Sequence, residues 1–196
     1  MPRQRDPGRR EELEAALVDH VLAHGLADLS LRGVAAALGV STFPLVYHFG
    51  SKEGLVAAAL AGAEERQRAM VAGWATADPG GGLAGVLRRY WAWASRDEAL
   101  PFFRLFFEVH GLALRQPERF PGFLDRAWRP WLGLLRGLAL DGGLPEADAE
   151  ADASFVASVA TGAMLGLLTT GDRAAAQRTI DLAAGCLDAL RLRPNG

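Results

Sequence analysis

The side chains most often used in catalysis are few in this chain of 196 residues. It has four histidines and one cysteine, which are His20, His24, His48, His110 and Cys186. His20 and His24 have helical i, i+4 spacing, but no third metal ligand lies nearby in the sequence. Neither H-E-x-x-H nor Glu-x-x-His is found, and the cysteine has no evident histidine partner. We therefore expect a protein that binds rather than catalyses, with no metal and no cofactor.

Binding chemistry is indicated instead by residues 29–53, LSLRGVAAALGVSTFPLVYHFGSKE. Ser30 is a candidate N-cap for one helix and Ser41 for a second, while Gly39 can end the first helix in a left-handed conformation. The apolar residues of the first helix recur at i, i+3, i+4 and i+7, and are Leu31, Val34, Ala35 and Leu38. Two helices across a tight turn form a helix-turn-helix, whose second helix enters the DNA major groove.

The residues expected to contact DNA surround the second of these helices, whose buried ridge is Leu45 and Phe49. Serine hydroxyls and N–H groups at helix N-termini can bind phosphate, although helix capping alone would also explain the serines. Thr42 can hydrogen-bond a base edge, and Phe43 or Val46 can meet a thymine methyl group. This helix contains no arginine, so bidentate recognition of guanine is not expected from it. The full candidate set is Ser30, Arg32, Ser41, Thr42, Phe43, Val46, Tyr47, His48 and Lys52.

The remainder of the chain shows helical periodicity and no strand signal, which predicts an all-α protein of about nine helices. A helix over Arg9–His24 would complete a three-helix head. A long helix from Lys52 to about Ala72 would follow, with a solvated middle at residues 64–68. Three further helices are expected around residues 83–94, 101–115 and 131–138, with Pro121 and Pro130 as interruptions, and two more over 146–170 and 173–192.

Composition limits the class of protein further. Half of the residues are hydrophobic, so a sizeable core is expected, and the net charge of −2 argues against a protein that coats nucleic acid. A single cysteine suits a reducing compartment. No apolar run follows the N-terminal arginines, and the most apolar window, Phe155–Leu168, is shorter than the roughly 20 residues that span a bilayer. We expect a soluble cytoplasmic protein.

The order of caps, turn and hydrophobic ridge resembles that of the TetR (tetracycline-repressor) family of transcriptional regulators. The matching residues are Ser30, Arg32, Val34, Ala35, Gly39-Val40-Ser41, Leu45, His48-Phe49 and Ser51-Lys52-Glu53. The chain departs from the family at Val46, where tyrosine is usual, and at Phe43-Pro44, where small residues are usual. The resemblance implies a DNA-binding domain over residues 1–53 and an α-helical effector-binding and dimerisation domain over residues 54–196.

The resemblance also implies partners, namely an operator in double-stranded DNA, a second copy of the chain and a small effector. Packing of small residues between subunits would use Ala157, Thr161, Gly162, Gly166, Ile180 and Leu187, although packing within the chain is the alternative. An apolar or aromatic effector would lie among Trp74, Trp91, Phe103, Phe106, Phe107, His110, Trp128, Trp131 and Met164, unless these residues only fill the core. The expected function is that of a dimeric repressor released from a pseudo-palindromic operator. The other classes considered are an all-α protein-interaction module and an enzyme without a recognisable catalytic motif.

Overall fold

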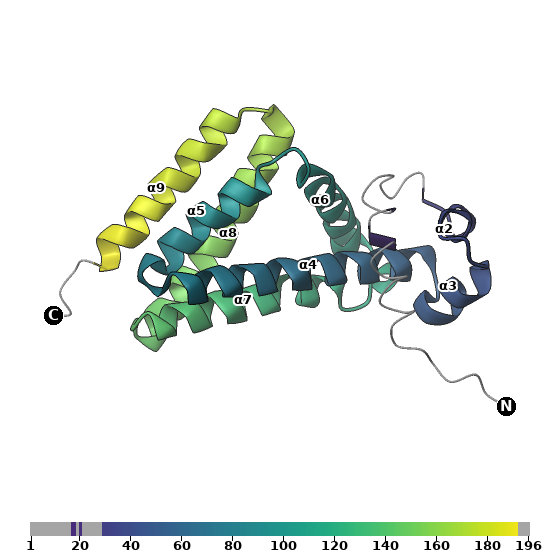
Figure 1. Ribbon diagram of the computed structural model, residues 1–196, viewed down its shortest axis with the longest axis horizontal. Coiled ribbons are helices and arrows are strands. Elements are labelled where there is room, and N and C mark those ends of the chain that lie inside the picture. The colour runs from purple at the N-terminus through teal and green to yellow at the C-terminus, as the bar shows by residue number, and fades with distance from the viewer. Residues whose placement is uncertain (1–16, 19, 21–28, 192–196) are drawn as a thin grey trace. The chain divides into compact units, whose positions relative to one another are not determined.

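The computed structural model describes residues 17, 18, 20 and 29–191, and in these residues the regular structure is helical throughout (Figure 1). The helices are α2 (Leu31–Ala37), α3 (Thr42–Phe49), α4 (Lys52–Ala77), α5 (Gly82–Ala94), α6 (Leu100–Arg115), α7 (Phe123–Asp141), α8 (Glu146–Thr170) and α9 (Arg173–Arg191). Two short 3-10 helices, η1 (Pro79–Gly81) and η2 (Pro117–Arg119), precede α5 and α7. The predicted all-α class is confirmed. The helix expected over Arg9–His24 lies almost entirely outside the described residues.

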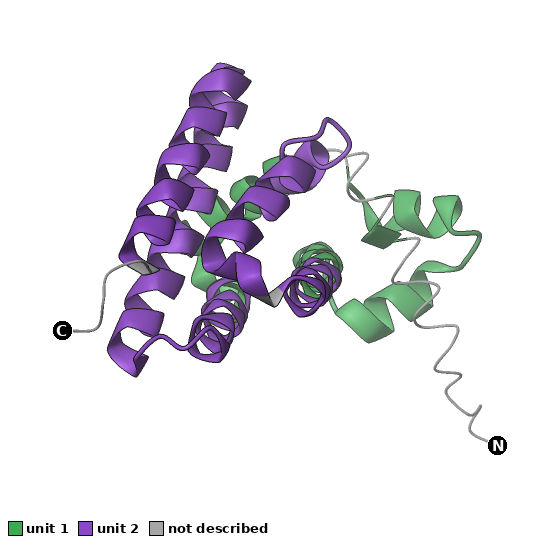
Figure 2. Ribbon diagram, turned by 60° about the vertical axis from the view of Figure 1, so that its left-hand side comes forward, with its two compact units in different colours: residues 1–65, 104–124 green, residues 66–103, 125–196 purple. Residues whose placement is uncertain are grey.

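The chain forms two compact units (Figure 2). Unit 1 contains residues 1–65 and 104–124, and unit 2 contains residues 66–103 and 125–196. Helices α4, α6 and α7 each contribute residues to both units. The division at residue 53 that the sequence suggests is a functional one, and it stays a prediction.

In unit 1, α2 and α3 form the expected helix-turn-helix. The backbone N–H of Gly33 donates to Ser30 Oγ over 3.0 Å, so Ser30 caps α2, an interaction whose loss typically costs about 1 kcal/mol. Gly39 has a φ of +64°. Its N–H donates to the Ala36 carbonyl at 3.2 Å, and the Val40 N–H donates to the Ala35 carbonyl at 2.9 Å. These two bonds form a Schellman motif, which ends α2 as predicted.

Helix α3 begins after Ser41, but the Ser41 side chain makes no capping hydrogen bond among the described residues. The hydroxyl therefore does not have the capping role that the sequence suggested, although the position is right. Pro44 is the third residue of α3, inside the first turn, where its missing N–H leaves no helical bond unmade. Leu45 is 1% exposed and anchors α3 in the core.

In unit 2, helices α5, α8 and α9 pack against one another. The inner face of α9 contributes Ile180, Ala184 and Leu187, all of which are buried. An ion pair at 2.7 Å joins Arg88 on α5 to Asp188 on α9. The three helices therefore form a three-helix cluster within this unit.

Helix α8 has 25 residues and is longer than the apolar window counted in the sequence. By length and composition alone it is the one helix, among the described residues, that could cross a membrane. Core helices meet the same criterion, and α8 packs along α5 and α9.

Two helices differ from the sequence-based expectations. Helix α4 continues to Ala77, and its middle is not simply solvated, because Glu64 is 4% exposed and Gln67 is 6% exposed. Both residues continue the stripe of Leu60 and Val71 at spacings of three and four, so helical geometry carries them inward. Helix α7 also continues through Pro130, which the sequence analysis expected to interrupt it.

Candidate DNA-binding and effector-binding sites

Helix α3 presents a row of apolar and aromatic side chains to the outside. Phe43 is 74% exposed, Tyr47 is 62% exposed and Val46 is 46% exposed. The Phe43 and Tyr47 rings lie one helical turn apart, with centroids 6.1 Å apart and an interplanar angle of 20°. Large apolar side chains that stay in water while Leu45 is buried beside them mark a contact surface.

The other candidate DNA-contacting residues also lie in unit 1, on or beside the helix-turn-helix. Ser30, Arg32, Ser41 and His48 are exposed, whereas Thr42 and Lys52 are half-buried. The His48 ring meets Tyr47 edge-on, with centroids 5.2 Å apart. The structure thus places all nine candidates in the same unit, and their contact with DNA stays a prediction.

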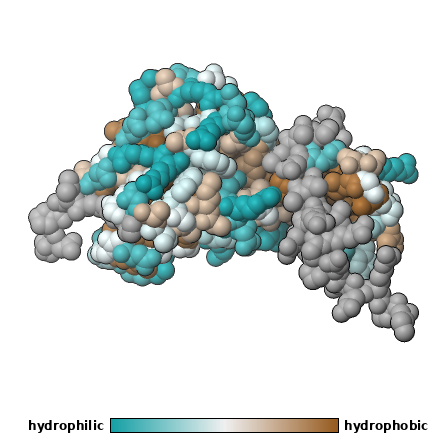
Figure 3. All heavy atoms as spheres, viewed as in Figure 1, coloured by the Kyte–Doolittle hydropathy of each residue, from teal (hydrophilic) through white to brown (hydrophobic). Residues whose placement is uncertain are grey.

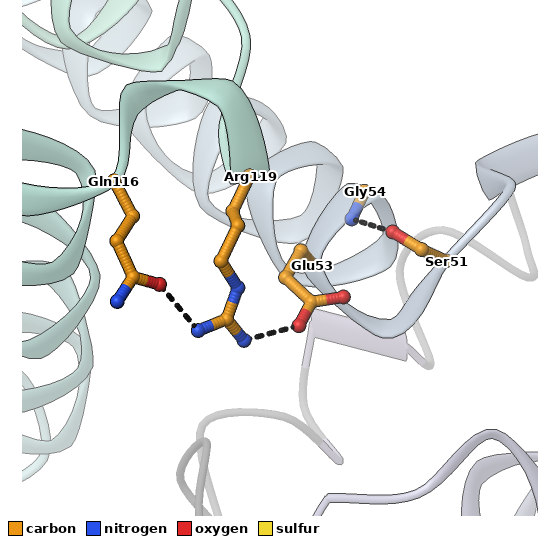
Figure 4. A network of polar contacts seen from close by, with 5 residues as sticks. All are labelled: Ser51, Glu53, Gly54, Gln116 and Arg119. Carbon is orange, nitrogen blue, oxygen red and sulfur yellow. Dashed lines mark hydrogen bonds and ion pairs between the residues drawn. The ribbon is translucent and has the colours of Figure 1, made fainter.

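Figure 4 shows the interactions that hold the start of α4. The Gly54 N–H donates to Ser51 Oγ at 3.0 Å, so Ser51 caps the helix. A side chain at Gly54 would not fit, because its Cβ would lie 2.1 Å from the backbone carbonyl oxygen of Phe49. Glycine at this position therefore allows the end of α3 to lie directly against the first turn of α4. The only sequence signal for this was a glycine in the first turn of an otherwise strong helix.

Glu53, next to Lys52, forms an ion pair with Arg119 of η2. The Arg119 guanidinium donates to Glu53 Oε1 at 2.5 Å and to Gln116 Oε1 at 2.8 Å (Figure 4). The hydrogen bond from Arg119 is the largest cause that lowers the pKa of Glu53 below 4.5, helped by backbone N–H donation and opposed by burial. Two segments 66 positions apart in the sequence are joined in this way beside the predicted phosphate contacts.

This ion pair should make stability depend on pH in a defined window. A carboxyl whose folded pKa lies below its unfolded value of 4.5 stabilises the protein above pH 4.5, and the contribution disappears as the pH falls through the folded pKa. We expect Arg119→Met to lower the free energy of unfolding at pH 7 by at most about 1 kcal/mol, because the pair is partly exposed. Urea unfolding at pH 3 to 7 should show this difference shrinking toward zero at the acidic end. A constant difference at every pH would contradict the assignment.

The nine residues predicted to line an effector pocket fall into the two units. Phe106, Phe107 and His110 belong to unit 1, where the Phe106 centroid lies 5.5 Å from both the Phe107 ring and the His110 ring. Phe123, which the sequence analysis did not single out, lies 6.2 Å from Phe106 in the same cluster. His110 Nδ1 is buried with no hydrogen-bond partner among the described residues. Burial lowers the pKa of His110 below its usual 6.5, so the imidazole is neutral at pH 7.

The other six predicted pocket residues belong to unit 2. Trp91 and Met164 are each 2% exposed and fill the core, Phe103 is 6% exposed, and Trp74, Trp128 and Trp131 are half-buried. Of these six, only Phe103 and Trp131 are linked to each other by successive ring contacts among the described residues. Their link runs through Tyr90 and Trp93 of α5, which were not among the predicted pocket residues. The i, i+3 spacing of Tyr90 and Trp93, which places both rings on one side of a helix, was the sequence feature that could have predicted this link.

The predicted dimer residues divide between inner and outer faces of unit 2. Ile180 and Leu187 are 0% and 2% exposed within the chain itself, so they cannot offer surface to a partner, and this part of the prediction is corrected. Ala157 is also buried, at 9% exposure, and Thr161 is half-buried. Gly162 and Gly166 are exposed.

Exposed apolar residues accompany these glycines on the outer faces of α8 and α9. They are Phe155, Leu165, Leu182 and Leu190. Figure 3 shows hydrophobic patches between hydrophilic side chains on this unit. Sequence periodicity identified the apolar side of α9, but that side faces inward, and Leu182, which is 71% exposed, lies on the opposite side.

The fold and the geometry of α2 and α3 define a class of protein, namely the all-α DNA-binding proteins with an N-terminal helix-turn-helix. The family model for bacterial regulatory proteins of the tetR family matches residues 19–59. Residues 19–59 are therefore similar to the DNA-binding domain of the tetR family of bacterial regulatory proteins, and the helix-turn-helix of α2 and α3 lies within this match.

Solved structures of similar fold match nearly the whole chain. A TetR-family member from Streptomyces coelicolor is 26% identical, with a TM-score of 0.68, over 96% of this chain and 99% of that one. The multidrug binding protein EbrR, solved with imidazole, is 28% identical, with a TM-score of 0.66, over 100% of this chain and 95% of that one. A protein assigned to the same family from Mesorhizobium loti is 20% identical and has a TM-score of 0.73, over 95% of this chain and 98% of that one. No curated protein matches the sequence.

Proposed function

We propose that this protein is a cytoplasmic repressor that binds a pseudo-palindromic operator as a homodimer and is released by a small apolar or aromatic effector. The observation that carries the proposal is the outward row on α3, in which Phe43, Val46 and Tyr47 remain exposed beside a buried Leu45. A folded monomer gains nothing from holding two aromatic rings in water on one helix face. A major groove lined with bases gives them a partner.

The chemistry of α3 favours a particular kind of base reading. Its eight residues, TFPLVYHF, contain no arginine, lysine, asparagine or glutamine, which are the side chains that form bidentate contacts with guanine or adenine. Phe43 and Val46 can instead contact the methyl group of thymine, while Thr42 and Tyr47 can hydrogen-bond. We propose that Lys52 and the hydroxyls of Ser30, Ser41 and Ser51 contact phosphates.

The reading surface of one α3 is short, so a second α3 is needed to bind a second half-site of the operator. A dimer supplies this second helix. Gly162, Leu165 and Gly166 lie along one exposed stripe of α8, and Leu182 lies on an exposed side of the adjacent α9. A side chain at either glycine would meet no atom within 4 Å among the described residues. The two glycines, together with the exposed Leu165 on the same stripe, leave room for the close approach of another helix, and we propose that this helix comes from a second copy.

Effector binding is supported by the aromatic content of both units and by one relative. EbrR is described as a multidrug binding protein and was solved with ethidium as well as imidazole. Here the connected aromatic residues of unit 2, Tyr90, Trp93, Phe103 and Trp131, come from α5, α6 and α7, and bundle interiors are common places for apolar ligands. Release requires that the effector bind more tightly to the conformation that does not fit the operator.

Selection of bound sequences from random double-stranded DNA tests the proposal directly. The expected product is a two-fold symmetric site with half-sites separated by about 10 base pairs or a multiple of that distance. Thymines should be enriched at the central positions of each half-site. An unsymmetrical site would contradict dimeric binding, and half-sites fixed only by G·C pairs would contradict reading by Phe43 and Val46.

Two variants separate base reading from phosphate contact at the selected site. We expect Tyr47→Ala and Lys52→Ala to weaken operator binding by about tenfold or more, while the fold and the dimer are retained. Lys52→Ala should weaken binding to all sequences alike and reduce the slope of log K against log salt by about 1. Gel-shift titrations at several salt concentrations give both quantities, with Arg66→Ala on the exposed middle of α4 as the control. Unchanged binding by both variants would refute the assignment.

A further inference from the structure

Unit 2 contains an arginine that lies within an aromatic cluster and whose Nη1 has no acceptor in the described part of the chain. The guanidinium carbon of Arg68, on α4, lies 5.9 Å from the centroid of the Trp131 ring on α7. Arg68 Nη1 itself is fully buried. No carboxylate among the described residues forms an ion pair with this arginine. A buried N–H of a charged group costs free energy when it has no acceptor. We therefore expect a further group, outside the described residues, to accept a hydrogen bond from Arg68 Nη1.

The surroundings of Arg68 are flat and aromatic. The Trp131 ring meets Tyr90 edge-on, with centroids 5.6 Å apart. The cluster continues from Tyr90 to Trp93 at 5.8 Å and from Trp93 to Phe103 at 6.4 Å. Four helices, α4, α5, α6 and α7, contribute to it, and all of these residues belong to unit 2. Such rings offer faces and edges for an aromatic ligand.

The polar groups joined to the cluster by a described hydrogen bond, Tyr90 and Gln67, are neutral. The Tyr90 hydroxyl donates to Gln67 Oε1 at 3.3 Å, and Gln67 is 6% exposed. Arg68 Nη1 does not donate to this oxygen, since it has no hydrogen-bond partner among the described residues. The guanidinium therefore gives the cluster a positive charge, and its planar N–H groups match a carboxylate in geometry.

We propose that Arg68 binds the carboxylate of an aromatic effector whose ring packs against the Trp131 and Tyr90 side of the cluster. This inference rests on the proposed effector-binding function and specifies the ligand as an aromatic anion. The contrast with ethidium, a planar aromatic cation that EbrR binds, makes the charge preference the distinguishing property. Arg68 selects the charge, and the rings supply the apolar contact.

The test compares three flat ligands of different charge on the full-length protein without DNA. 1-Naphthoate, the neutral 1-naphthalenemethanol and ethidium are titrated by calorimetry and by tryptophan fluorescence. We expect 1-naphthoate to bind at least tenfold more tightly than the neutral alcohol, as charge-assisted hydrogen bonds imply. Equal or tighter binding of the alcohol or of ethidium, or no binding of 1-naphthoate, would overturn the proposal.

Substitutions then assign the preference to this arginine. Arg68→Met should abolish the advantage of the carboxylate, and Arg68→Lys should retain part of it. The exposed neighbour Arg66→Met is the matched control and should leave the advantage unchanged. A preference that persists in Arg68→Met would overturn the assignment, and because the ligand comparison uses the wild-type chain, it stands even if a variant fails to fold.

A final measurement separates this inference from the proposed function. The three ligands are added to the protein bound to its selected operator. If 1-naphthoate binds through Arg68 and the operator is not released, the proposed regulation fails while the ligand site stands. If ethidium or the alcohol releases the operator and 1-naphthoate does not, the ligand class fails while the regulation stands.

Discussion

Leucine at both Gly162 and Gly166 should leave the chain folded and convert the proposed dimer into a monomer. Both glycines lie on the exposed side of α8, where an added Cβ would meet no atom within 4 Å among the described residues. Leucine also favours helix over glycine by roughly 0.5 to 1 kcal/mol per residue, so the isolated chain should not lose stability. Only a second helix packed closely on this stripe would be displaced by the larger side chains.

The consequence for DNA binding should be large. A dimer places two heads on one operator, and loss of the second head typically costs a factor of 100 to roughly 10,000 in affinity. Light scattering of the double variant should give the monomer mass, and gel-shift titration should give the loss of affinity. The matched control is leucine at Gly133, an exposed glycine of α7 in the same unit, where an added Cβ would also meet no described atom within 4 Å. This control should remain dimeric, and a dimeric double variant would refute the interface.

Alanine at Gly54 should destabilise unit 1, whereas alanine at Gly62 on the same helix should stabilise the protein. At Gly54 the new Cβ would lie 2.1 Å from the Phe49 carbonyl oxygen, and this atom belongs to the backbone, which cannot rotate away. Relief of the overlap must displace α3 or α4, at a cost of about 1 to 3 kcal/mol. At Gly62, which is exposed, the Cβ would meet nothing within 4 Å in the described part of the chain. There only the helix propensity of alanine remains, which is worth about 1 kcal/mol.

The two substitutions are chemically identical, yet we expect changes of opposite sign in the free energy of unfolding. A general effect of replacing glycine by alanine would not produce this result. Urea unfolding of Gly54→Ala and Gly62→Ala gives the two free-energy changes. We also expect Gly54→Ala to weaken operator binding by more than its loss of stability explains, because α3 would no longer lie in its place beside Ser51 and Lys52. If both variants were stabilised alike, the close approach of α3 to α4 would be disproved.

The local structure of the helix-turn-helix could be predicted from short-range patterns. Ser30, Gly39 and the apolar spacing of α2 each act within a few residues, through a cap, a left-handed turn and a helical period. The bounds of α8 were predicted for the same reason, since loop residues flank a long uninterrupted helical pattern. The hydroxyl of Ser41 shows the limit, because its position at the helix start did not establish its hydrogen bond.

Which element packs against the apolar side of each helix depended on residues that are distant in the sequence. Periodicity shows that α9 has an apolar stripe, but not whether α5 and α8 or another subunit covers it, and Ile180 and Leu187 proved to face inward. The same limit hid the partner of Glu53, since Arg119 lies 66 positions away. The residue pattern of one helix does not show which other element packs against it.

The sequence by itself determined the all-α class, the helix-turn-helix and the apolar side chains of its reading helix, because each depends on contacts within a few residues. Tertiary structure alone decided that Gln67 is buried, that Gly54 lies against the Phe49 carbonyl and that Arg68 lies beside Trp131, its Nη1 without an acceptor among the described residues. These properties arise where separate helices meet. The residues that hold the DNA-reading helix in place, and those that we propose select the effector, belong to this second group.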